Sequence, residues 1–75
     1  MVRLRLERLK RGWSLQTLGF HTGIQGAEIS KMERGILVPY PTQRERLARV
    51  MGLRVDELLE EVASQDVSQA EAAHA

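Results

Sequence analysis

The side chains best suited to chemistry in this sequence are charged and sit on one short predicted helix. Glu28 and Lys31 are three residues apart, so a helix would present a hydrogen-bond acceptor and a donor on one face. Gly26 and Ala27 lie beside them and allow a close approach to whatever that face contacts, and Gln25 precedes them as the N-cap. The sequence holds no nucleophile–base constellation, Gly-rich phosphate loop or set of metal ligands. It therefore predicts a binding protein rather than an enzyme, with no metal and no cofactor.

Two short helices joined by a tight turn must position these side chains. The first is predicted from Leu15 to about Thr22, and the second from Gly26 or Ala27 to Arg34, because apolar residues recur at helical spacing. Ser14 is a good N-cap for the first helix. Gly23 lies where the chain must reverse, and glycine adopts a positive φ there without steric cost.

Three more helices are expected around this pair, so the predicted fold is all-α, a compact five-helix bundle. One runs from Leu4 to Arg11, one from Pro41 or Thr42 to Met51, and a fifth follows Gly52. The inward side chains of the first and last of these helices are predicted to be Leu6, Leu9 and Trp13, and Leu58, Leu59 and Val62. Residues 1–63 form the predicted domain. Residues 64–75 form an acidic C-terminal tail, either a helical extension or disordered.

The charge of the chain is divided along its length. All eleven Lys and Arg lie within residues 1–54 with four acids, which gives +7, whereas residues 55–75 carry six acids and no Lys or Arg. A basic body suits a polyanionic partner, and an acidic tail is often a solvating or regulatory segment that can bind protein. There is no cysteine and no apolar run of membrane-spanning length, and the first residues do not begin a secretory signal. We therefore expect a soluble, cytoplasmic protein without membrane contact.

These features resemble a known family, and the match extends from about Leu4 to Leu59. The residues that carry it are Arg8, Gly12-Trp13-Ser14, Leu18, Gly23, Ile24, Ile29, Ser30, Glu33-Arg34-Gly35, Pro39, Leu47-Ala48, Gly52 and Asp56-Glu57-Leu58-Leu59. In this pattern the chain resembles the lambda-repressor/Cro-like (xenobiotic-response-element type) helix-turn-helix family. Where family members usually carry another apolar residue, this chain has Arg44, which points to a thinner core there or to an arginine available to phosphate.

The resemblance implies double-stranded DNA as partner, with the second helix of the motif in the major groove. The base-reading positions would be Gln25, Gly26, Ala27, Glu28 and Lys31. A glutamate can accept from the cytosine amino group and a lysine can donate to guanine. Phosphate would be bound at helix N-termini and by nearby arginines, and these positions are Ser14, Leu15, Gln16, Arg34, Thr42, Gln43 and Arg44.

Two further predictions concern stability and assembly. By the same resemblance, Arg8 and Glu33 would form a structural ion pair. A homodimer interface is expected at Leu53, Val55, Leu58, Leu59 and Val62, because these apolar residues exceed what a five-helix core must bury. The predicted function is a sequence-specific transcriptional regulator, a repressor that binds palindromic operator DNA as a dimer. The alternative is a protein-interaction module or antitoxin that keeps the fold with weak or lost DNA reading.

Overall fold

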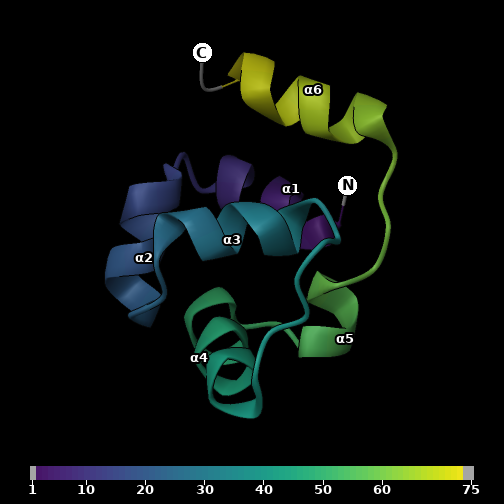
Figure 1. The fold of residues 1–75 in the computed structure, drawn as a ribbon. Coiled ribbons are helices and arrows are strands. Elements are labelled where there is room, and N and C mark those ends of the chain that lie inside the picture. The colour runs from purple at the N-terminus through teal and green to yellow at the C-terminus, as the bar shows by residue number, and fades with distance from the viewer. Residues whose placement is uncertain (1, 74–75) are drawn as a thin grey trace.

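Six helices make up the part of the chain that the computed structural model describes, residues 2–73. They are α1 (Arg3–Lys10), α2 (Leu15–Thr22), α3 (Gly26–Glu33), α4 (Pro41–Met51), α5 (Val55–Leu58) and α6 (Ser64–Ala73), arranged as Figure 1 shows. The all-α prediction is confirmed for these residues. The count of five was too low because the acidic tail also folds, as α6. His74 and Ala75 lie outside the described residues.

Local signals account for the bounds of the central helices. Ser14 Oγ accepts a hydrogen bond from the backbone N–H of Thr17 at 3.0 Å, which caps α2 as expected for a serine at this position. Gly23 ends α2 with φ +73°, and its N–H donates to the Gly19 carbonyl at 2.7 Å. Pro41 opens α4, where a missing N–H costs nothing. The predicted bounds of α2 and α4 are therefore confirmed.

The core lies where α1 to α5 meet. Its fully buried apolar side chains are Leu4, Leu18, Ile29, Met32, Leu47 and Leu58. Of the side chains expected to face inward from the first helix, Leu6 is buried outside the main core cluster, Trp13 is half-buried and packs against the core, and Leu9 is half-buried. The side chains of α1 that face the core are Leu4 and Arg8, one turn apart. Arg8 is buried there because it bonds to the buried carboxylate of Glu33.

The chain closes on itself at the end of α5. Helix α5 stops at Leu58, not near Val62 as expected, because the following residues leave the helix to pair with the N-terminal segment. The Arg3 N–H donates to the Glu60 carbonyl at 2.7 Å, and Val2 forms an isolated antiparallel bridge with Glu61. The Val2 N–H also donates to the Glu33 carbonyl at 3.2 Å. These bonds join the start of α1, the end of α3 and the end of α5.

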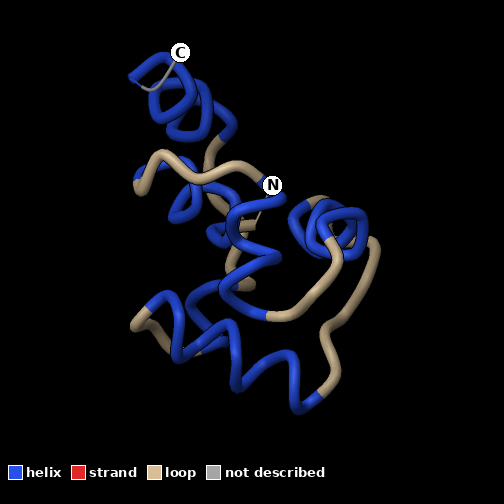
Figure 2. The backbone as a smooth tube through the Cα atoms, turned by 90° about the vertical axis from the view of Figure 1, so that its left-hand side faces the viewer, coloured by secondary structure: helices blue, strands red, loops and turns tan. Residues whose placement is uncertain are grey.

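Helix α6 packs against α1, at the end of the molecule away from α4 (Figures 1 and 2). Val67 of α6 and Leu6 of α1 are both buried, and neither belongs to the main core cluster. An ion pair joins Arg5 to Glu71 across the same contact. The helical alternative for the tail is therefore the one observed in residues 64–73. No helix among residues 2–73 is long and apolar enough to cross a membrane.

Candidate nucleic-acid interface

The turn between α2 and α3 is set by close backbone contacts. A Cβ added at Gly19 would lie 2.6 Å from the carbonyl oxygen of Ile24, a distance that real Cβ atoms do not tolerate. Thr22 secures the same turn, since its hydroxyl donates to the Leu18 carbonyl at 2.8 Å and accepts from the Ile24 N–H at 3.3 Å. Gly19 therefore makes room for the backbone of the turn that precedes α3.

Helix α3 presents a narrow strip of exposed residues. Ala27, Lys31 and Arg34 are exposed at helical spacing, while Ile29 and Met32 face the core. Gln25 is also exposed, at the N-cap of the helix. Gly26 and Glu28, expected on this strip, are half-buried instead, because both lie toward neighbouring helices. A Cβ on Gly26 would meet Leu15 of α2 at 3.6 Å, and Glu28 is bonded to α4.

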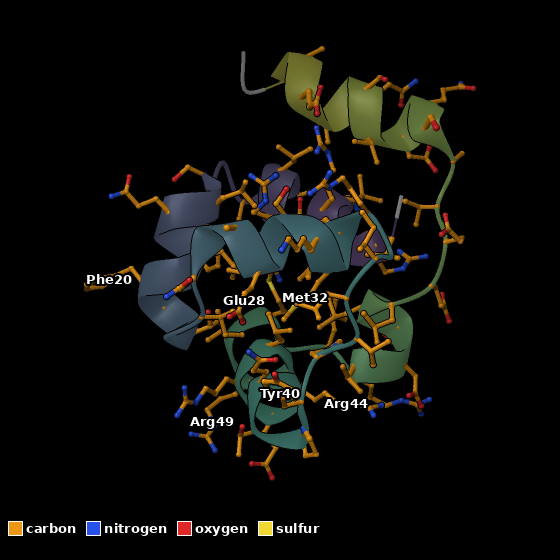
Figure 3. The ribbon with its side chains drawn as sticks, viewed as in Figure 1. Phe20, Glu28, Met32, Tyr40, Arg44 and Arg49 are labelled. Atoms are coloured by element: carbon orange, nitrogen blue, oxygen red, sulfur yellow. The ribbon has the colours of Figure 1, made fainter. Side chains whose placement is uncertain are left out.

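Glu28 takes part in a chain of hydrogen bonds between α3 and the start of α4. Gln43 donates from Nε2 to Glu28 Oε2 at 2.9 Å and accepts at Oε1 from the backbone N–H of Tyr40, also at 2.9 Å. Figure 3 shows Glu28 beneath α3, facing α4, with Tyr40 at the near end of α4. Gln43 was expected to help bind phosphate at the N-terminus of α4, and its side-chain amide is hydrogen-bonded within the protein.

The other expected phosphate contacts differ in exposure. Ser14, Gln16 and Thr42 are exposed at the starts of α2 and α4, and Arg34 is exposed at the end of α3. Leu15 is half-buried against the core, so its contribution could only be its backbone N–H. Arg44 is partly engaged, with Nη2 3.9 Å from Asp56 Oδ1.

Two arginines of α4 were missed as candidates for phosphate. Arg46 and Arg49 are exposed, and Arg46 Nη1 reaches the Thr22 carbonyl at 3.5 Å, beside the turn before α3. Figure 3 shows Arg49 projecting from α4 into solvent. The sequence could have indicated both arginines, because they fall on the polar side of α4, opposite Leu47. These two side chains extend the positive charge of the interface from α3 onto α4.

Comparison with known proteins adds one decisive observation. Residues 2–62 match the family described as a helix-turn-helix domain. The chain belongs to the helix-turn-helix domain family. Neither a curated protein nor a solved structure matches it significantly. The match ends before α6, which begins at Ser64.

Inside the helix-turn-helix domain, Arg8 and Glu33 lie together as a buried pair. Arg8 Nε is 2.7 Å from Glu33 Oε2, and Arg8 Nη2 is 3.1 Å from Oε1, a bidentate geometry. The third guanidinium nitrogen, Nη1, donates to the carbonyl of Trp13 at 2.8 Å. The residues are only 6% and 1% exposed. This pair joins α1, the connection to α2 and the end of α3.

The apolar residues expected at a dimer interface divide into two groups. Leu58 is fully buried in the core of the monomer, so it has no surface left for a partner, which corrects its assignment. The remaining four, Leu53, Val55, Leu59 and Val62, are half-buried. A shallow groove of about 350 Å³ lies between α4 and α5. Its lining residues are Arg44, Glu45, Ala48, Arg54, Val55 and Asp56.

Proposed function

We propose that this chain is a sequence-specific DNA-binding regulator of the lambda-repressor/Cro-like type, with α3 in the major groove of its target. The observation that supports this most directly is the exposed strip of Ala27, Lys31 and Arg34 on α3. Small and basic side chains on the second helix of a helix-turn-helix fit a groove lined with base edges and flanked by phosphates. The starts of α2 and α4 supply N–H groups for those phosphates.

Salt dependence tests the DNA-binding part of this proposal. Each phosphate contact lowers the slope of log K against log salt by about 0.9 on duplex DNA. With the basic body and two helix N-termini engaged, we expect a steep fall in affinity for duplex DNA between low and high salt. A gel shift over a tenfold range of salt measures this slope. Affinity that does not change over that range would reject DNA binding through phosphates.

Selection of bound sequences from a random duplex library tests the claim of specificity. We propose that the chain binds as a homodimer to a palindrome, with half-sites one helical turn apart, about 34 Å. Enriched sequences with two-fold symmetry at this spacing are the expected result. As a repressor, the dimer would act by occupying its operator and excluding other proteins from it.

The proposed dimer interface uses the half-buried residues after α4. The groove between α4 and α5 has an apolar floor at Ala48 and Val55, and its rim carries both arginines and acids. A rim with both signs of charge can complement a copy of itself across a two-fold axis. We expect Leu59→Glu to weaken operator binding more than it lowers the melting temperature of the monomer. Sedimentation velocity, with and without DNA, gives the oligomeric state, and a monomer in both samples would reject the dimer.

A second candidate function rests on the exposed apolar side chains. Phe20 is 86% exposed and Val38 is 72% exposed. Ile36 and Tyr40 are each 66% exposed. Figure 3 shows Phe20 projecting from α2 at the edge of the molecule. Large exposed apolar residues favour a protein partner, as in an antitoxin or an interaction module. That function is preferred if the chain binds duplex DNA only weakly, and if Phe20→Ser and Val38→Ser leave this binding unchanged.

A further inference from the structure

The hydrogen bonds around Gln43 fix the orientation of its side-chain amide. The backbone N–H of Tyr40 can only donate, so the Gln43 atom that faces it at 2.9 Å must be the carbonyl oxygen Oε1. The opposite atom, Nε2, is a donor and faces Glu28 Oε2, also at 2.9 Å. A flipped amide would set N–H against N–H at Tyr40 and oxygen against carboxylate at Glu28. The protein therefore imposes a donor on residue 28.

This imposed donor determines what residue 28 can offer to a ligand. Glu28 is half-buried, and its Oε2 is occupied by Gln43. The other carboxylate oxygen, Oε1, remains as an acceptor for a ligand. In the major groove, cytosine and adenine present amino groups that can donate to such an oxygen, whereas guanine and thymine present carbonyl oxygens. A residue held as an acceptor therefore discriminates between these two pairs of bases.

We propose that Gln43 is a specificity-determining residue, which acts by holding residue 28 as a hydrogen-bond acceptor toward a base that carries an amino group. This inference rests on the proposed DNA-binding function, and it gives the Gln43 side chain a role in specificity. Gln43 itself touches no base. It sets the polarity of the residue that does.

The proposal makes an unusual prediction for the substitution Glu28→Gln. A free glutamine can use both its oxygen and its nitrogen on a base. A glutamine at position 28 must turn its oxygen toward Gln43 Nε2, so its own amino group points outward as a donor. We therefore expect E28Q to lose the preference for cytosine, which presents only a donor, and to gain affinity for guanine or thymine at one position in each half-site. The expected change in preference is about three- to tenfold, as one hydrogen bond gained or lost supports.

A second substitution should reverse the change. In the double variant E28Q/Q43E, the glutamate at position 43 still accepts from the Tyr40 N–H, and its other oxygen now faces residue 28 as an acceptor. The glutamine at position 28 must then turn its amino group inward and its oxygen outward. The double variant should therefore regain the wild-type preference for cytosine or adenine. It also carries the same net charge as the wild type, so electrostatic repulsion from phosphate is matched.

Selection from a random duplex library, with the full-length chain and each variant, is the deciding experiment. The control is E28Q/Q69E, which has the same net charge as the double variant but places the added acid on α6, where it cannot reach position 28. This control should keep the E28Q preference. If the wild type selects a sequence but E28Q keeps the same base, or if E28Q/Q43E does not restore it, the role of Gln43 is rejected and DNA binding stands. If the wild type selects no sequence at all, the proposed function and this inference fall together.

Discussion

Removing one partner of the buried Arg8–Glu33 pair should cost much of the stability of this domain. In Glu33→Leu the guanidinium of Arg8 would keep its bond to the Trp13 carbonyl but lose both bonds to the carboxylate. Stranding one charge of a buried pair costs about 3–5 kcal/mol. The whole free energy of unfolding of a 75-residue chain is on the order of 4–11 kcal/mol, from about 0.05–0.15 kcal/mol per residue. The variant should therefore lose between about a quarter and all of this free energy, and it is close to unfolded at room temperature where the wild type lies at the lower end of the range.

Replacing both partners separates the cost of the stranded charge from the value of the pair. In Arg8→Met with Glu33→Leu no charge remains, and most of the loss should be recovered, as for other buried ion pairs replaced by apolar residues. The recovery should be incomplete by about 1–3 kcal/mol, because the Trp13 carbonyl loses its side-chain donor.

Urea unfolding followed by far-ultraviolet circular dichroism and by the fluorescence of Trp13 measures these differences. Glu71→Leu is the matched control, because it removes the acid of the more exposed Arg5–Glu71 pair. Its cost should stay at about 0–1 kcal/mol. If Glu33→Leu costs no more than Glu71→Leu, or if the double variant is as unstable as the single one, the assignment of a stranded buried charge is incorrect.

Three further predictions concern the glycine contacts around the α2–α3 turn, the attachment of α6, and the contact of Lys31 with DNA. Gly19→Ala should destabilise the fold by about 1–3 kcal/mol in urea unfolding, although alanine favours helix, because its Cβ has no room. Gly26→Ala, whose Cβ would make ordinary contacts, should be tolerated. Val67→Asp should release α6 from α1, which proteolysis would detect as early cleavage after residue 62, while the helix-turn-helix domain stays folded. Lys31→Ala should cost about 1–3 kcal/mol on the selected DNA site if the lysine meets guanine, and a similar amount on every sequence if it meets only phosphate.

The parts of the fold that the sequence predicted are those with local causes. The N-cap at Ser14, the left-handed turn at Gly23 and the proline at the start of α4 each act within a few residues, so their effects can be inferred from the order of the chain. The same holds for the exposed positions of α3, where the core-facing spacing of Ile29 and Met32 leaves Ala27 and Lys31 outside.

The parts that the sequence did not predict depend on partners distant in the chain. Helix α5 ends early because Glu60 and Glu61 pair with the N-terminal segment. The tail folds as α6 with a single buried apolar residue, Val67, which is too weak a signal in an alanine-rich segment. The half-buried position of Glu28 likewise results from Gln43, fifteen residues later. No pattern within either helix indicates this contact.

The bridge between Val2 and Glu61 brings the start and the end of the helix-turn-helix domain together. The two ends of the family domain lie side by side, so a short peptide could join them and new termini could be opened elsewhere, for instance in the exposed segment around Val38. Helix α6 follows Glu61 in the chain, so it lies outside the segment between the two joined ends. It can therefore be exchanged for another segment while the path of the chain through α2 and α3 stays the same.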